Sequence, residues 1–450
     1  MSSTVNRVVK NTGFLYAKMG ITMFISLYTT RLILNSLGTS DFGIYNIVGG
    51  AISMLGFLNV AMASATQRFM SYSEGEGNLK KETSIFNVSI ILHFLIAITA
   101  GIALVIAGYF FFHGILNIPY GRIFAAKVVY GSLIVSTMFS VMTVPYDAAM
   151  NAHENMRYYA LVGILESFLK LAVAFACVYT SKDKLIVYGV LMACVPLISL
   201  TIMRIYCHRH YEECITAPRK YWNKGLMKEM TSFAGWNFAG SIGAIVGNYG
   251  NGIVVNHFFG AVLNAALGIA NQLNGQLMAF SNNMMKALNP VIVKNEGAKK
   301  RDDMMRYSLA GCKFSFLLLA FFSVPFLIET PYILRLWLKT VPEWTIAFTR
   351  LQIIRSLLEL LTLGLGTSLS AVGKIKELNI YTLILDLLPL VILTILFSLG
   401  FSPYWLYIIA IFFMVIIASG IKIFYCVQYC DLKLYKLFHD VFYPAILCIG

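Results

Sequence analysis

Amide side chains recur at helical spacing inside apolar segments of this chain. Asn264, Asn271 and Asn282 fall on one face of an expected helix, and the same face ends at Lys286. Carboxamides can hydrogen-bond sugar hydroxyls, and lysine or arginine beside them can bind a diphosphate. We therefore predict a polar surface for an anionic, sugar-bearing substrate. Its predicted amide lining is Asn46, Asn237, Asn248, Asn251, Asn264, Asn271 and Asn282.

Ionisable residues also lie well inside apolar segments. A charged side chain at the centre of a membrane helix costs about 2.5–3.5 kcal/mol or more, so such residues must face protein or water. The predicted substrate-binding cations are Arg31, Arg68, Lys286, Lys313, Arg350 and Arg355. The candidate groups for coupling transport to an ion are Glu166, Glu359 and Asp386.

Structural roles stay open for some of these charges. Glu166 with Lys170, and Arg355 with Glu359, have the i,i+4 spacing of a pair that neutralises itself. The side chain of Arg31 is long enough to reach a membrane interface. After both pairs are set aside, the remaining charges are still mainly cationic, which favours an anionic substrate.

Four glycines share a line beside the asparagines of residues 232–257. Gly240, Gly243, Gly247 and Gly250 have the spacing that lets two helix backbones approach closely in lipid. We expect this row to pack against another helix.

The composition identifies the solvent in which these residues operate. Hydrophobic residues make up 58% of the 450-residue chain and charged residues 12%, and the mean hydropathy is +0.73. A soluble domain has about 25% charged residues. In lipid only helices and closed barrels satisfy every backbone group, and apolar runs of about 20 residues are too long for alternating strands. We expect an all-α polytopic membrane protein.

Twelve apolar segments are long enough to cross a bilayer. Basic residues concentrate in alternate loops between them, which places both termini in the cytoplasm. The net charge of +14 is largely this topology signal, so nucleic-acid binding is not expected. The expected spans are about 12–35, 42–67, 86–112, 123–147, 158–180, 185–206, 232–257, 261–288, 307–330, 344–371, 378–400 and 403–425.

The basic segment 208–230 divides these spans six and six. An even number of spans in each half predicts two parallel repeats. The polar helix faces of the halves match at an offset of 218 residues, and the Glu-Gly loops match better at 222, one helical turn away. We expect an N-terminal six-helix lobe at 1–207, a cytoplasmic linker at 208–230, a C-terminal six-helix lobe at 231–428 and a cytoplasmic or interfacial tail at 429–450.

Four stretches resemble a known family. They are RLILNSLGTSDFGIYNIV at 31–48, SATQRFMSYSEGEGN at 64–78, VPYDAAMNAHENMRYYALVGILESFLKL at 144–171, and the block at 233–297 that contains VVNHFFGAVLNAALGIANQLNGQ. They resemble the polysaccharide-export branch of the MOP (multidrug/oligosaccharidyl-lipid/polysaccharide) flippase superfamily, and within it the O-antigen flippases of the Wzx type. The resemblance extends from residue 7 to about residue 430 and is most specific in the last block.

The resemblance implies a MATE-like pair of six-helix lobes around a central cavity. The implied substrate is an undecaprenyl-diphosphate-linked oligosaccharide, moved across a bacterial inner membrane with H⁺ or Na⁺ as the coupling ion. Arg31 and Arg68 are the counterparts of cavity arginines in relatives that flip a peptidoglycan precursor. Those relatives carry an extra C-terminal helix pair, whereas residues 441–449 here are too short to span a membrane. Other implied partners are the bilayer and a polysaccharide polymerase machinery, with no cofactor.

Two alternatives belong to other functional classes. A cation-coupled multidrug exporter of the same superfamily would be expected to line its cavity with carboxylates. A membrane-embedded polysaccharide polymerase would be expected to carry a large outer loop with paired catalytic groups. The outer loops here are short, and neither a nucleophile–base set nor a metal cluster is recognisable in the sequence. We therefore expect a transporter and not an enzyme.

Overall fold

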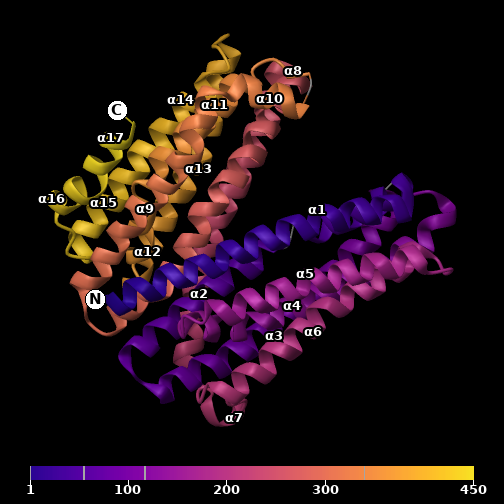
Figure 1. Ribbon diagram of the computed structural model, residues 1–450, viewed down its shortest axis with the longest axis horizontal. Coiled ribbons are helices and arrows are strands. Elements are labelled where there is room, and N and C mark those ends of the chain that lie inside the picture. The colour runs from indigo at the N-terminus through magenta and orange to yellow at the C-terminus, as the bar shows by residue number, and fades with distance from the viewer. Residues whose placement is uncertain (1, 54–55, 116–117, 339, 450) are drawn as a thin grey trace. The chain divides into compact units, whose positions relative to one another are not determined.

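The computed structural model describes residues 2–53, 56–115, 118–338 and 340–449. All regular secondary structure in these residues is helical (Figure 1). The chain divides into two compact units, Met1–Thr231 (unit 1) and Ser232–Gly450 (unit 2).

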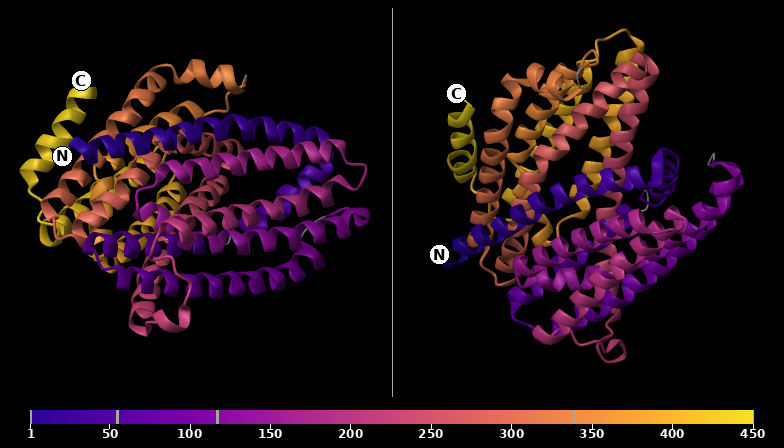
Figure 2. Two further views of the ribbon diagram at one scale, coloured as in Figure 1. Left: turned by 60° about the horizontal axis from the view of Figure 1, so that its bottom comes forward. Right: turned by 45° about the vertical axis from the view of Figure 1, so that its right-hand side comes forward.

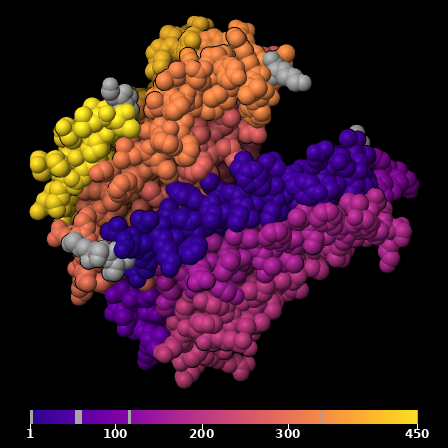
Figure 3. Space-filling view, in the orientation of Figure 1, coloured from indigo at the N-terminus to yellow at the C-terminus, as the bar shows by residue number. Residues whose placement is uncertain are grey.

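Unit 1 is a bundle of long helices that lie alongside one another (Figure 2). Helix α4 is central to it, because α4 contacts α1, α2, α3, α5 and α6. Helix α1, in indigo, lies along α5 (Figure 3). The helices are α1 (Ser2–Ser53), α2 (Gly56–Glu76), α3 (Leu79–Phe110), α4 (Ile123–Ala152), α5 (Met156–Tyr179), α6 (Lys184–His210) and the short α7 (Pro218–Tyr221), with a π-helical turn Phe111–Ile115 and a 3-10 turn Tyr120–Arg122.

Unit 2 is also a bundle of helices, in which α9 contacts α10, α11, α12 and α17. Its tail packs onto the bundle, since Ala445 of the last helix is buried in a cluster with Phe316 and Leu319 of α9. The helices are α8 (Lys224–Gly297), α9 (Arg301–Ile328), α10 (Thr330–Leu338), α11 (Thr345–Leu360), α12 (Leu363–Val372), α13 (Lys376–Ser398), α14 (Trp405–Ala410), α15 (Ala418–Tyr429), α16 (Leu434–Leu437) and α17 (Tyr443–Ile449), with π-helical segments Ile411–Ile417 and Phe438–Phe442.

The helices have the length and composition of membrane spans. Eight helices in the described residues are long and apolar enough to cross a membrane, and α11 with α12, which are bent by 42°, would form a ninth span. The exposed side chains of α3 include Phe94, Ile102 and Val105, as expected of a lipid-facing surface. The prediction of an all-α polytopic membrane protein is confirmed.

Two of the long helices contain a tight turn at a glycine. Gly38 within α1 has a φ of 77°, and Gly260 within α8 has a φ of 81°. This region of backbone conformation is readily available only to glycine. Helix α8 therefore contains two of the predicted spans, 232–257 and 261–288, on either side of Gly260.

The same turns define the internal repeat. Gly38 and Gly260 are 222 residues apart, and so are the first residues of α3 and α9, Leu79 and Arg301. Helices α4 and α11 likewise begin 222 residues apart. The backbone therefore repeats at the offset indicated by the loops, and the polar faces, matched at 218, are displaced by one helical turn.

The glycine row of α8 packs against α13, as predicted. A Cβ atom on Gly243 would lie 3.0 Å from the Cα atom of Leu383, and one on Gly247 would lie 3.1 Å from the carbonyl oxygen of Asp386. Side chains larger than hydrogen would push the two helices apart. These glycines therefore serve close packing.

Arg122 holds together the end of unit 1 that is remote from the N-terminus. Its Nε donates a hydrogen bond to Asp41 Oδ1 (2.8 Å), and its Nη2 donates to Asp183 Oδ1 (3.2 Å). Partial burial would raise the pKa of Asp183, but the hydrogen bonds from Arg122 and the amide of Ile186 lower it below its ordinary value. Asp183 thus stays charged and caps α6.

Candidate functional site

The second half of α8 has a buried apolar face and an exposed polar face. Leu263, Ala266 and Ala270 are buried in the core of unit 2. The exposed residues of this half, from 261 to 289, are mostly small or carry amides: Ala261, Val262, Ala265, Gly268, Asn271, Gln272, Gly275, Gln276 and Asn282. Val262 is the one large hydrophobic side chain among them. This face differs from the apolar surface of α3 and is unsuited to lipid.

The remaining predicted amides have mixed surroundings. Asn46 and Asn248 are exposed, and Asn237 accepts a hydrogen bond from Asn379 Nδ2 (3.2 Å). Asn251 and Asn264 are half-buried. A Cβ atom on Gly252 would lie 3.3 Å from the side-chain oxygen of Asn264, so the two halves of α8 approach each other beside the turn at Gly260.

The predicted cations of the long helices are accessible to different degrees. Arg31 is exposed, whereas Arg68, Lys286 and Lys313 are half-buried. The Arg68 guanidinium lies over the rings of Phe69 (4.8 Å) and Tyr72 (4.7 Å), so part of its surface is already covered. At the repeat offset of 222 residues, Lys286 of unit 2 lies one helical turn before the position that corresponds to Arg68 of unit 1.

Arg350 and Arg355 have structural contacts. Arg350 donates from Nε to the carbonyl oxygen of Leu327 (3.0 Å) and from Nη2 to that of Ile328 (3.2 Å), which satisfies the last carbonyls of α9. Arg355 lies 4.0 Å from Glu359, the i,i+4 pair expected from the sequence. Both arginines thus have roles that do not require a substrate.

Asp386 is the most buried of the candidate coupling carboxylates. It is 7% exposed, and its Oδ2 has no hydrogen-bond partner among the described residues. Its charged neighbours are Arg355 and Glu359 on α11 and Lys422 on α15. A carboxylate placed between helices and close to several charged groups can bind a cation or a proton.

Glu166 in unit 1 has a different environment. Its Oε1 lies 2.7 Å from Lys170 Nζ, one turn along α5, so the pair neutralises itself. Lys18 of α1 adds a second cation, because its ammonium lies 4.0 Å from the ring centroid of Tyr159 and packs against Gly163. Lys18 was not among the predicted cations, although a lysine within the expected span 12–35 was a usable signal.

His153 connects three elements at the predicted cytoplasmic end of unit 1. Its Nε2 lies 2.7 Å from Glu213 and its Nδ1 lies 3.2 Å from Glu74, while Tyr211 stacks on the ring at 4.1 Å. Burial alone would lower the pKa of His153, but the hydrogen bonds with Glu213 and Glu74 raise it to about 9. The imidazolium therefore holds the ends of α2, α4 and α6 together at neutral pH.

A His153→Gln variant should lower the melting temperature of the purified protein at neutral pH. The contribution of the imidazolium is complete below the ordinary pKa of 6.5 and is lost as pH rises through about 9. In thermal unfolding measured from about pH 6 to about pH 10, the difference from wild type should therefore shrink. His210→Gln, at an exposed position, is the control. A difference that is constant with pH would contradict this assignment.

No group of three or more histidine, cysteine or acidic residues in the described part of the chain is arranged to hold a metal ion.

Two protein-family models match this chain. A family model described as polysaccharide biosynthesis protein matches residues 8–296, which is more than half of the chain. The chain belongs to the polysaccharide biosynthesis protein family. A second model, described as MatE, matches residues 251–395. The predicted membership of the polysaccharide branch of the MOP superfamily is confirmed, and a search of curated proteins found no match.

Solved structures of other superfamily members share the fold of this family member. A MATE protein in the bent conformation has a TM-score of 0.81 at 12% identity, covering 98% of this chain and 97% of its own. An outward-facing multidrug resistance MATE family transporter of the MOP superfamily has a TM-score of 0.76 at 12% identity, covering 98% and 95%. A MOP superfamily transporter from Pyrococcus furiosus, whose binding pocket is described as having reverse polarity, has a TM-score of 0.73 at 12% identity, covering 96% of each chain. The family member thus shares the fold of these proteins, that of a multi-pass membrane protein of the twelve-helix, two-lobe class.

Proposed function

We propose that this transporter is a flippase for undecaprenyl-diphosphate-linked oligosaccharide, such as the repeat unit of an O-antigen, capsule or exopolysaccharide. It acts by alternating access in the bacterial inner membrane, with both termini in the cytoplasm. The transporter makes and breaks no covalent bond and uses no cofactor. Its glycan is elongated by a separate polymerase machinery.

The exposed polar face of α8 carries this proposal. Over residues 261–289 it presents the amides of Asn271, Gln272, Gln276 and Asn282, and it reaches Lys286 at its end. Amides that donate and accept hydrogen bonds suit the hydroxyls of a glycan, and a lysine suits the diphosphate. A polar face of this length in a membrane helix is best explained by contact with water and a polar substrate. Arg31, Arg68 and Lys313 are the further cations assigned to the diphosphate.

The site of ion coupling is assigned to Asp386 in preference to Glu166. Glu166 has Lys170 at 2.7 Å, and Lys18 adds a further positive charge on the neighbouring helix. Asp386 is buried with one carboxylate oxygen free of hydrogen bonds to any described residue. Binding and release of H⁺ or Na⁺ at this carboxylate, with Glu359 as a second carboxylate, would drive the cycle.

A cation-coupled multidrug exporter is the second candidate, because the MatE model matches residues 251–395. A cationic drug would require exposed carboxylates on the polar face of α8. That face carries amides and Lys286 instead, and the acidic residues Glu359 and Asp386 lie on other helices. Its polarity therefore favours an anionic substrate.

A deletion strain of the source bacterium should accumulate lipid-linked oligosaccharide, because assembly continues while export stops. Mass spectrometry of the lipid extract should detect undecaprenyl diphosphate carrying a complete repeat unit, and the glycan identifies the substrate. Complementation with the wild-type gene should clear the intermediate. Unchanged lipid-linked glycans together with raised susceptibility to cationic drugs would instead support the multidrug exporter.

A further inference from the structure

A basic strap runs along the predicted cytoplasmic end of unit 1. We define the strap as residues 204–228, which contain the end of α6, α7 and the first turn of α8. Three large hydrophobic side chains in it are exposed: Ile205 by 48% at the end of α6, Ile215 by 53% and Trp222 by 44%. Six of its basic side chains are also exposed, namely Arg204, Arg209, Arg219, Lys220, Lys224 and Lys228.

The acidic residues of the strap do not cancel this charge. Glu213 is buried and its carboxylate is paired with His153, so it does not neutralise the exposed basic side chains. Glu212 is exposed and is the one acidic side chain of the strap that remains accessible. The strap surface therefore carries a clear excess of positive charge.

The path of the strap is fixed by a buried amide of α3. Asn87 is 0% exposed, and its Nδ2 donates to the carbonyl oxygen of Ile215 (2.8 Å). Its Oδ1 accepts a hydrogen bond from the amide of Ala217 (2.8 Å). Because both contacts are to the main chain, they set the position of α7 regardless of the side chains that the strap carries.

These contacts also set the depth of the strap in the membrane. The ring of His208, near the end of α6, lies 6.2 Å from that of Phe86, the residue before Asn87. Phe86 and Asn87 of α3 therefore contact both the end of the apolar part of α6 and the strap. Helix α7, which contacts α3, lies at the same depth as that end of α6. Tryptophan and basic side chains at this level are typical of the boundary between membrane and water.

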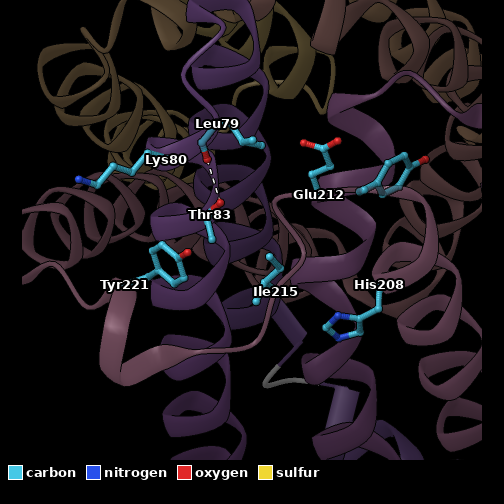
Figure 4. A pocket seen from close by; sticks show the side chains of 8 residues that line it. Leu79, Lys80, Thr83, His208, Glu212, Ile215 and Tyr221 are labelled. Carbon is cyan, nitrogen blue, oxygen red and sulfur yellow. Dashed lines mark hydrogen bonds between the residues drawn. The ribbon is translucent and has the colours of Figure 1, made fainter.

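A pocket lies between the strap and the start of α3 (Figure 4). Its volume is about 560 Å³, and Lys80, Thr83, Tyr221, His208 and Glu212 are among its lining residues. Lys80 and Tyr221 lie on one side, with the Lys80 ammonium directed outward, and Glu212 and His208 lie on the other (Figure 4). An ammonium suits a phosphate, and a carboxylate opposite it can accept hydrogen bonds from hydroxyl groups.

We propose that the basic strap and this pocket bind an anionic phospholipid of the cytoplasmic leaflet, with a phosphoglycerol headgroup as the best fit. The phosphate meets Lys80 and the basic side chains of the strap, and the glycerol hydroxyls reach Glu212. Ile215 and Trp222 enter the boundary region beside the acyl chains. The proposal concerns unit 1 alone and does not depend on which substrate the transporter carries.

Lipid retention by the purified full-length protein tests the proposal. Protein taken from nanodiscs of equal phosphatidylglycerol and phosphatidylethanolamine should retain phosphatidylglycerol preferentially in native mass spectrometry. An Arg219→Gln, Lys220→Gln, Lys224→Gln variant should lose most of that preference. A Lys299→Gln, Lys433→Gln, Lys436→Gln variant removes the same charge from exposed positions elsewhere and should keep it.

Equal loss in the two triple variants would overturn the proposal, because it would reduce the effect to general charge attraction. Unchanged retention in the strap variant would also overturn it, and would leave the strap for an acidic protein partner. Binding of inorganic phosphate in place of lipid would also overturn the proposal.

Fluorescence quenching gives a second test that needs only one mild substitution. Brominated phosphatidylglycerol should quench wild-type tryptophan emission more than brominated phosphatidylethanolamine does. Trp222→Phe should abolish that difference, while Trp337→Phe, also exposed but in unit 2, should not. A lipid difference that persists without Trp222 would contradict the proposed depth and headgroup preference.

Discussion

A Lys286→Ala variant is expected to restore less than about a tenth of surface polysaccharide when it complements a deletion strain, while its amount in the membrane stays at the wild-type level. A charge-assisted contact to the diphosphate contributes roughly 1.5–3 kcal/mol, and about 1.4 kcal/mol corresponds to a factor of ten. Arg68→Ala should act in the same direction. Surface polysaccharide and membrane-protein levels are measured together by immunoblotting.

Two matched variants separate loss of binding from loss of charge in general. Lys286→Arg keeps the cation on the polar face of α8 and should restore most export. Lys433→Ala removes an exposed cation from the loop before α16 and should export normally. Normal export by both Lys286→Ala and Arg68→Ala would remove the electrostatic basis of the proposed substrate.

A Gly364→Ala variant is expected to be strongly destabilised. A Cβ atom at this position of α12 would lie 2.2 Å from the carbonyl oxygen of Ser308 in α9, and backbone cannot yield as a side chain can. Separation of the helices would break the hydrogen bond from Ser368 to Ser308 (2.6 Å). Overpacking costs about 1–3 kcal/mol or more, and each kcal/mol lowers the melting temperature of a domain of about 200 residues by about 2–4 °C.

The control lies two residues away on the same helix. Nothing lies within 4 Å of a Cβ atom built on Gly366, so Gly366→Ala should keep or raise the melting temperature. Thermal unfolding of the purified variants, followed by size-exclusion chromatography, measures both. Equal stability of the two variants would show that α9 and α12 can move apart without loss.

Much of the fold follows from hydrophobic length and from glycine. The apolar runs predicted the spanning helices because lipid requires each backbone group to be satisfied within its own segment. The repeat at 222 residues was visible in the loops, and the structure places Gly38 and Gly260 at that offset. The expected spans 12–35 and 42–67, and 232–257 and 261–288, already separated the helical segments near these two glycines, and the non-helical φ and ψ angles of Gly38 and Gly260 mark the breaks.

The candidate site was less predictable, because a sequence gives the face of a helix but not its neighbours. The amide row at Asn271 and Asn282 was placed on one face from spacing alone, and both residues are exposed in the structure. The contacts of Arg350 with the end of α9 could not be foreseen, because they depend on which helix ends beside it. A role in substrate binding stays a prediction for Asn271, Asn282 and Arg350 alike.

Two polar clusters were missed for a related reason. His153 and Glu213 are 60 residues apart, and only the fold brings them within 2.7 Å. Asn87 has the ordinary appearance of a polar residue near the start of a span, yet it fixes the strap through two main-chain hydrogen bonds. Pairings between distant segments depend on packing, which a single sequence does not specify.

Translocation by purified protein in proteoliposomes tests the central claim most directly. Undecaprenyl diphosphate carrying the oligosaccharide found in the deletion strain is placed in the membrane, and the fraction accessible to an external glycosidase is followed with time. The account predicts that the wild-type protein moves the lipid-linked glycan across the bilayer and that Lys286→Ala does so at least about tenfold more slowly. Equal rates for the two proteins, or transport of cationic drugs with no movement of the glycan, would contradict it.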